Sequence, residues 1–142
     1  MKTYTERPKI RVLVADDHAL ILRMICDFLS QEPDIEVVGQ ASDGDSAIEA
    51  VTSAQPHVMI LDVRMPNLGG IEAIPRIKEK WPHIHVICMS ITHEESVINE
   101  AFNVGASGYM FKGGTGHEFA DSVRTVVAGG RYLSQRGKAA RT

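Results

Sequence analysis

The sequence predicts an α/β domain in which helices cover both faces of a parallel β-sheet. Five short apolar runs alternate along the chain with five segments whose apolar residues recur in steps of three and four, as in amphipathic helices. The central run, residues 58–61, is apolar without a break, which is typical of a strand buried on both sides. The 142 residues suffice for one such domain and are too few for two ordinary ones.

The first part of the chain contributes two strands and two helices. Residues 10–15 form the first expected strand, and residues 20–29 carry the apolar spacing of a helix. The second expected strand, residues 35–40, includes a glutamate and a glutamine, so we place it at an edge of the sheet. The next helix begins at Asp43, a residue type that caps helix N-termini, and ends before Pro56.

The central apolar run ends at Asp62 and is followed by a turn rich in proline, asparagine and glycine. A helix is expected next, over residues 70–81. Pro75 lies just past its first turn, where most N–H groups lack partners within the helix, so we expect the helix to tolerate it. The fourth and fifth strands are expected at residues 86–89 and 109–111.

Two capping boxes mark the starts of the last two helices. Thr92 precedes Glu95, and Thr115 precedes Glu118, at the three-residue spacing that lets each side chain bond the other's backbone N–H. They predict one helix over residues 93–104 and a last helix that ends at a glycine pair.

Composition and charge narrow the class of protein. Residues 1–9 read as an N-terminal extension that lacks the apolar core of a signal peptide, and no apolar run is long enough to cross a membrane. The net charge of −3 combines −7 over residues 1–130 with +4 over the final segment, 131–142, so the folded body is acidic and does not attract nucleic acid by charge. Cys26 and Cys88 lie among apolar neighbours, and we expect buried free thiols in a reducing cytoplasm.

Polar residues stand where four of the expected strands end. Asp16 and Asp17 end the first strand, Asp62 the third, Ser90 the fourth and Lys112 the fifth. The carboxyl ends of parallel strands share one edge of a sheet, which is where ligands bind in such folds. Two carboxylates about 4 Å apart repel by roughly 1 to 4 kcal/mol, so three of them need a cation or raised pKa values.

The residue types at this edge indicate phosphoryl transfer. Carboxylate oxygens suit Mg²⁺, which often bridges carboxylates and phosphate. The lysine and the serine suit the oxygens of a phosphoryl group. A carboxylate nucleophile beside a divalent cation is a known route to an aspartyl phosphate, so Asp62 is the candidate acceptor. His18 is not expected to bind Mg²⁺, for which neutral imidazole is a poor ligand.

These residues, with Met65-Pro66 after Asp62, resemble the signature of the receiver domain of two-component response regulators. The resemblance covers residues 10–130. It implies a flavodoxin-like (CheY-like) doubly wound (βα)5 three-layer sandwich with the parallel sheet order 2-1-3-4-5. It also implies a cytoplasmic signalling protein, not an enzyme, that a sensor histidine kinase phosphorylates on Asp62.

The resemblance also assigns roles to individual residues. Asp17 and Asp62 would bind Mg²⁺ directly, together with the backbone carbonyl of Arg64, and Asp16 would bind it through a water molecule.

In the same way, Ser90 and Lys112 would contact the phosphoryl oxygens, and Tyr109 would be the aromatic switch residue. The alternative for Tyr109 is a half-buried aromatic packed on the last strand. Phosphorylation would change the face formed by the helix at 93–104, the fifth strand and the last helix, and so control dimerisation or output.

Three stretches are similar to the NarL/FixJ/LuxR-type regulators: Asp16-Asp17-His18, residues 105–109 and residues 128–134. In those proteins the closing stretch leads to a helix-turn-helix DNA-binding domain. We therefore expect residues 131–142 to be a basic linker towards such an output domain, absent from this chain, which alone would contact DNA; activation would produce a homodimer. A single-domain regulator stays an alternative. Gly113 departs from the family pattern, in which proline or aspartate is common, and leaves that loop's conformation open.

Two other functions share part of this residue set. A Mg²⁺-dependent phosphohydrolase with an aspartyl nucleophile usually carries a second aspartate two residues later, where this chain has Arg64. A flavin-binding protein of similar fold needs a phosphate-binding loop after the first strand, where Asp16 and Asp17 would repel the phosphate.

Overall fold

A computed structural model describes residues 8–92 and 94–134 of the chain. Its centre is a parallel six-stranded sheet in the order β2-β1-β3-β4-β5-β6, so the predicted order of the first five strands is confirmed. The strands are β1 (Ile10–Ala15), β2 (Ile35–Ala41), β3 (Val58–Asp62), β4 (His85–Ser90), β5 (Gly108–Phe111) and β6 (Tyr132–Leu133). The helices are α1 (Ala19–Ser30), α2 (Gly44–Ala54), α3 (Gly70–Lys80), α4 (Glu95–Asn103) and α5 (Gly116–Val127).

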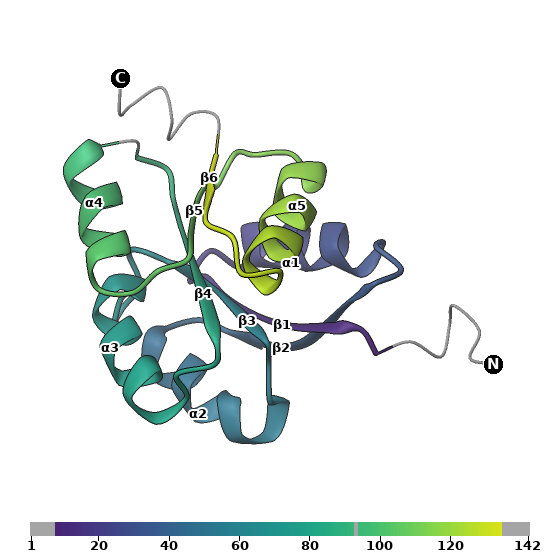
Figure 1. The fold of residues 1–142 in the computed structure, drawn as a ribbon, viewed down its shortest axis with the longest axis horizontal. Coiled ribbons are helices and arrows are strands. Elements are labelled where there is room, and N and C mark those ends of the chain that lie inside the picture. The colour runs from purple at the N-terminus through teal and green to yellow at the C-terminus, as the bar shows by residue number, and fades with distance from the viewer. Residues whose placement is uncertain (1–7, 93, 135–142) are drawn as a thin grey trace.

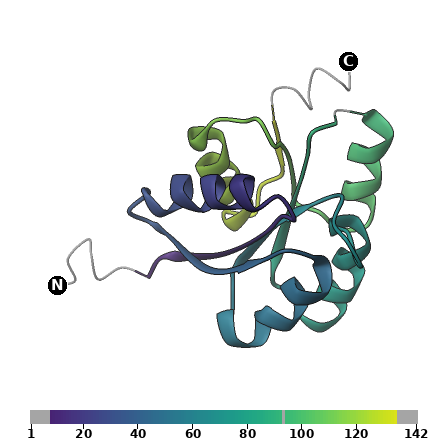
Figure 2. The same ribbon diagram turned by 180° about the vertical axis from the view of Figure 1, so that it is seen from behind.

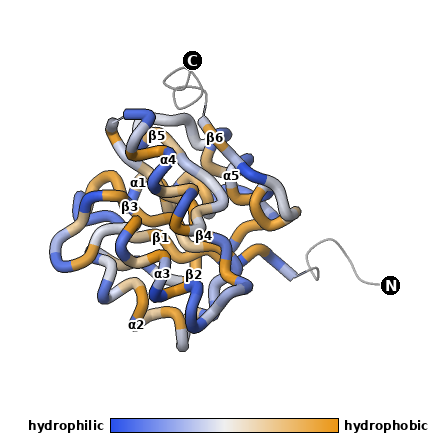
Figure 3. Tube along the Cα trace, turned by 60° about the vertical axis from the view of Figure 1, so that its left-hand side comes forward, coloured by the Kyte–Doolittle hydropathy of each residue, from blue (hydrophilic) through white to orange (hydrophobic). Residues whose placement is uncertain are grey.

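The helices form a layer on each side of the sheet (Figures 1 and 2). α1 and α5 lie together on one face, and α2, α3 and α4 cover the other. Because successive side chains of a strand point to opposite faces, the core has two halves. In β1, for example, Val12 and Val14 join the half under α1 and α5, while Leu13 and Ala15 join the other half. Hydrophobic residues are concentrated along the central strands of the sheet (Figure 3).

Both cysteines are buried and free, as predicted, and they lie in opposite halves of the core. Among the described residues, no helix is both long enough and apolar enough to cross a lipid bilayer. Pro75 lies inside α3, as expected, and the helix continues through it to Lys80.

The predicted capping box at Thr92 is wrong. α4 begins at Glu95, after an N-cap residue, Glu94, that makes no side-chain cap. The Thr92 hydroxyl instead lies 3.0 Å from the hydroxyl of Ser90. His93, at the predicted start of the helix, lies outside the described residues. The second capping box is confirmed, because Thr115 and Glu118 bond each other's backbone N–H groups.

The sheet also extends past the predicted end of the domain at residue 130. Tyr132 and Leu133 form β6, which pairs in parallel with β5, and Ser134 is buried. This start of the predicted linker is therefore part of the fold, because the unpaired edge of β5 accepts it as one more strand. The rest of that segment, 135–142, and most of the predicted N-terminal extension lie outside the described residues.

The strand register brings the polar strand ends together. Ala15 pairs with Leu61, so Asp16 follows β1 at the level of Asp62. Asp62 pairs with Met89, which places Ser90 one residue further along the neighbouring strand. These pairings fix the polar residues at one edge of the sheet before any side-chain contact is considered.

Candidate functional site

Lys112 lies at the centre of the acidic edge. Its ammonium is 2.9 Å from Asp16 Oδ2 and 2.9 Å from Asp62 Oδ2, and only 4% of its side chain is exposed. Both carboxylates are buried as well. The backbone places Lys112 directly after β5, where its N–H donates to the carbonyl of Ser90. One cation therefore balances two buried acids, and a net negative charge remains.

The pKa values of this pair reflect burial. Burial raises the pKa of Asp62, and repulsion from Asp16 adds to the effect, against the opposing influence of the hydrogen bond from Lys112. Burial alone lowers the pKa of Lys112, but its interactions with the two acids outweigh this and the pKa is raised. The ammonium stays charged, and Asp62 is a more basic carboxylate than one in water.

Asp17 and His18 form the outer rim of the site. The turn after β1 is closed by the His18 N–H, which donates to Asp16 Oδ1 at 2.8 Å. The His18 ring folds back on the same turn, with Nδ1 3.1 Å from Asp16 Oδ1 and 3.3 Å from Asp17 Oδ1. The ring nitrogen is also 3.2 Å from the Lys112 ammonium. The sequence prediction did not place His18 in the site.

This acidic edge fits a divalent cation. Asp16, Asp17, His18 and Asp62 each offer one donor atom, and these atoms lie within 4.8 Å of one another. Asp16 Oδ2 is buried and receives no well-directed hydrogen bond, although the Lys112 ammonium is near it. A carboxylate oxygen of this kind gains from a cation, and a set of carboxylates suits Mg²⁺. The Arg64 N–H donates to Asp62 Oδ1 at 3.2 Å and fixes that oxygen.

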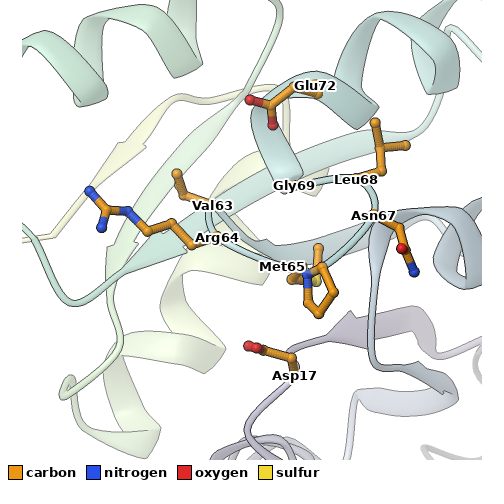
Figure 4. A pocket seen from close by; sticks show the side chains of 9 residues that line it. Asp17, Val63, Arg64, Met65, Asn67, Leu68, Gly69 and Glu72 are labelled. Carbon is orange, nitrogen blue, oxygen red and sulfur yellow. The ribbon is translucent and has the colours of Figure 1, made fainter.

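A cleft of about 560 Å³ opens beside these residues. Figure 4 shows Asp17 on one side of it and the loop that carries Arg64 and Met65 on the other. The loop is held in place by Asn67, which adopts a left-handed φ of 67° and donates from its side chain to Asp43 Oδ2 at 2.8 Å. The acidic edge is therefore open to solvent through a cleft with a fixed wall.

Thr92 connects the site to the interior. Its N–H donates to the Ser90 hydroxyl at 3.0 Å, and its carbonyl accepts from the Tyr109 hydroxyl at 3.4 Å. Tyr109 is fully buried, deeper than the half-buried packing considered as the alternative, and burial raises the pKa of its phenol. Sequence reasoning missed this bridge because it assigned Thr92 to a helix cap. A hydroxyl residue two positions after Ser90 was the available signal.

The structure also accounts for Gly113. The peptide bonds of the described residues are all trans, and the chain after Lys112 turns through a bond from the Gly114 N–H to the Phe111 carbonyl. A Cβ atom at Gly113 would lie 2.5 Å from the Phe111 ring. Glycine therefore fits because the aromatic ring occupies the space that a side chain would need.

Residues 12–124 match the profile of the response regulator receiver domain. The chain therefore belongs to the receiver domain family of two-component response regulators, which are signalling proteins rather than ordinary enzymes. The fold, the strand order and the acidic strand ends agree with this assignment.

The relatives are of the NarL/LuxR type, as the sequence motifs indicated. The chain is 32% identical over 133 residues to the transcriptional regulatory protein DegU of Brevibacillus brevis, and the match covers 94% of this chain and 56% of the relative. It is 31% identical over 124 residues to the nitrate/nitrite response regulator protein NarL of Escherichia coli, covering 87% and 57%. The chain thus spans little more than half the length of these relatives.

A solved structure shows the same fold. The signal receiver domain of the putative response regulator NarL from Mycobacterium tuberculosis superimposes with a TM-score of 0.83 at 31% identity. The match covers 87% of this chain and 99% of that domain.

Proposed function

We propose that this receiver domain is a phosphorylation-activated switch that accepts a phosphoryl group on Asp62 from a sensor histidine kinase, with Mg²⁺ as cofactor. The observation that carries the proposal is the pairing of Asp62 with Lys112 at 2.9 Å beside two further carboxylates, at the open end of a parallel sheet. An aspartate that only ended a strand or capped a helix would not need a buried lysine from fifty residues away.

The metal would be held by Asp17, Asp62 and the carbonyl of Arg64, with Asp16 binding through water. When bound, Mg²⁺ would offset the charge of the carboxylates and of the incoming phosphoryl oxygens. The donor set supports this assignment, because four donor atoms lie within 4.8 Å of one another.

The protein's own residues would position and stabilise the transfer. A carboxylate oxygen of Asp62 attacks phosphorus, the bond to the donor's imidazole nitrogen breaks, and the electron pair leaves with that nitrogen. The Lys112 ammonium, already 2.9 Å from Asp62, would then contact a phosphoryl oxygen. The Arg64 N–H keeps one carboxylate oxygen oriented throughout.

The switch would run through Ser90 and Thr92. A phosphoryl group adds about two negative charges and three acceptor oxygens, and Ser90 offers a neutral hydroxyl at the end of the adjacent strand. Turning that hydroxyl to phosphate would break its contact with Thr92, whose carbonyl holds the Tyr109 hydroxyl. Tyr109 is thereby linked to the chemistry at Asp62 through one residue.

The output would be a changed face formed by α4, β5 and α5. On this face the Arg131 guanidinium stacks on the Phe102 ring at 3.8 Å, next to the strand that carries Tyr109. We propose that the altered face promotes homodimerisation. Because relatives such as DegU are named as transcriptional regulators and are longer than this chain, the proposed output is a DNA-binding domain of the whole protein, which acts in the cytoplasm.

The test is labelling by acetyl phosphate, followed by intact-protein mass spectrometry. The parent should gain one phosphoryl group in the presence of Mg²⁺ and none after chelation with EDTA. Asp62→Asn should gain none, while the matched control Asp45→Asn, which changes an exposed carboxylate paired with Arg76, should label like the parent. If Asp62→Asn labels as well as the parent, the assignment of Asp62 is wrong.

A further inference from the structure

Residues 131–134 run along the outer edge of β5 and bond to it through the backbone (Figure 1). The Tyr132 N–H donates to the Ser107 carbonyl at 3.0 Å. The Ser134 N–H donates to the carbonyl of Tyr109, the proposed switch residue, at 3.1 Å. We call this four-residue segment the strap. It takes no part in the proposed phosphoryl transfer, yet it is bonded directly to the strand through which the switch would act.

The strap also contacts α4. Tyr109 and Leu133 are paired in register, so their side chains point to the same face of the sheet. That face is the one that α4 covers, and Leu133 packs against the half of the core that contains Tyr109. At the start of the strap, the Arg131 guanidinium stacks on the ring of Phe102 in α4 at 3.8 Å. The strap therefore bridges the strand that carries Tyr109 and the helix beside it.

The attachment of the strap is light, and its connection to α5 can pivot. Gly129, just after the end of α5, adopts a φ of 94°, a conformation that favours glycine, and no atom lies within 4 Å of the place that a Cβ would occupy. Two backbone hydrogen bonds and one stacked cation must offset the entropy lost by ordering four residues. A segment with so few contacts can open locally while the central strands stay folded.

The strap packs on the residue that the proposed switch would move. The Tyr109 hydroxyl bonds the Thr92 carbonyl at 3.4 Å, and phosphorylation of Asp62 would disturb that bond. Displacement of the Tyr109 side chain would then remove part of the surface on which Leu133 packs. We propose that the strap is an autoinhibitory contact: it is docked on β5 and α4 while Asp62 is unmodified, and it is released when Asp62 is phosphorylated.

This inference rests on the proposed function and adds a cover to the proposed dimer face. The strap occupies the outer hydrogen-bonding edge of β5, and Arg131 occupies one side of the Phe102 ring. A second copy of the chain can use these surfaces only after the strap has left. Thermodynamic linkage then requires a reciprocal effect, in which a change that weakens the strap strengthens the binding of a phosphoryl mimic at Asp62.

Amide hydrogen exchange measured by NMR, with and without beryllofluoride and Mg²⁺, tests the proposal. Beryllofluoride binds a carboxylate as a stable mimic of a phosphoryl group. In the free protein, the amides of Tyr132 and Ser134 should exchange at least about tenfold more slowly than unstructured amides. With beryllofluoride bound, their exchange should become about fivefold faster or more, while the amides of β1 keep their protection.

A matched pair of variants tests the linkage. Arg131→Gln removes the stacked cation and keeps the backbone bonds of the strap. Without beryllofluoride its strap amides should exchange about threefold faster than those of the parent, and its beryllofluoride affinity, from ¹⁹F NMR titration, should rise by about twofold to threefold. The control Lys80→Gln removes another cation stacked on an aromatic ring, that of Trp81 at the end of α3, and should leave both quantities unchanged.

The outcomes separate this inference from the proposed function. Beryllofluoride binding that leaves the strap amides as protected as before, or more protected, would overturn the inference and leave the proposed function standing. Strap amides that exchange at the unstructured rate in the free parent would do the same, as would a loosened strap in Arg131→Gln with an unchanged beryllofluoride affinity. A parent protein that does not bind beryllofluoride would overturn the proposed function and the inference with it.

Discussion

The ammonium of Lys112 lies 2.9 Å from a carboxylate oxygen of Asp62, although fifty residues separate them in the chain. The two side chains come from the ends of β5 and β3, and β4 lies between those strands. A side chain as long as lysine is needed to cross that distance. The contact ties the proposed acceptor to the strand that carries Tyr109, and so connects the site to the face proposed for output.

Removing the ammonium should destabilise the fold because it leaves two buried carboxylates without their cation. We expect Lys112→Met to lower the free energy of unfolding by about 1 to 3 kcal/mol. In an Asp62→Asn background the loss should be smaller by at least about 0.5 kcal/mol, because one of the two carboxylates is already neutral. Urea denaturation of the four proteins measures this coupling. Strictly additive effects would mean that the two residues do not interact.

Tyr109→Phe should separate stability from switching. The hydroxyl bond to Thr92 is long, at 3.4 Å, so its loss should cost less than about 1 kcal/mol and leave labelling of Asp62 intact. The dimerisation that follows labelling should weaken, because the side chain at position 109 would no longer bond the Thr92 carbonyl and could not respond to its movement. Sedimentation velocity with and without acetyl phosphate is the measurement. If the variant dimerises as fully as the parent, the Tyr109 hydroxyl is not part of the switch.

The two threonines of the predicted capping boxes should behave differently. Thr115→Ala removes a formed cap and should lower the free energy of unfolding by about 1 kcal/mol. Thr92→Ala removes no cap and should cost clearly less, because it removes only the contact between the hydroxyls of Thr92 and Ser90. Thermal unfolding of both variants decides the matter. An equal loss for the two would indicate that Thr92 does cap α4 in solution.

Acid should weaken the contact between Asp34 and Arg124, which joins the turn before β2 to α5. The side-chain hydrogen bond from Arg124 lowers the pKa of Asp34, so the folded protein binds fewer protons here than the unfolded chain. This stabilisation is present above the unfolded pKa of about 3.9 and is lost as the pH falls through the lower folded pKa.

Asp34→Asn should therefore be less stable than the parent at neutral pH, by less than about 1 kcal/mol because the carboxylate is 37% exposed. The difference should shrink below about pH 4. Urea titrations across this range, with Asp45→Asn as an exposed control, test it. A difference that grows in acid would contradict the sign of the shift.

The fold could be predicted because its signals are local. The unbroken apolar run before Asp62 indicated a central strand, and the polar residues of β2 indicated an edge; both predictions are confirmed. Strand ends that share one edge then placed Asp16, Asp62 and Lys112 together, and the structure brings them within bonding distance.

The features that the sequence did not predict depend on which partners side chains contact in the folded protein. The spacing of residues along the chain does not reveal this. Thr92 had the spacing of a capping residue, but its hydroxyl contacts the hydroxyl of Ser90 at the end of the preceding strand. His18 looked unsuited to Mg²⁺, and only the folded turn shows its ring nitrogen against the two acids. β6 was missed because two residues carry no periodicity, and pairing with β5 alone defines it.

The central claim is that the phosphoryl group is carried by Asp62. Borohydride reduces an aspartyl phosphate to homoserine, so treatment of the acetyl phosphate-labelled protein marks the modified residue permanently. Peptide mapping by mass spectrometry should find homoserine at position 62 in a Mg²⁺-dependent manner, with Asp16 and Asp17 unchanged. Homoserine at either of those positions, or none after labelling, would contradict the account.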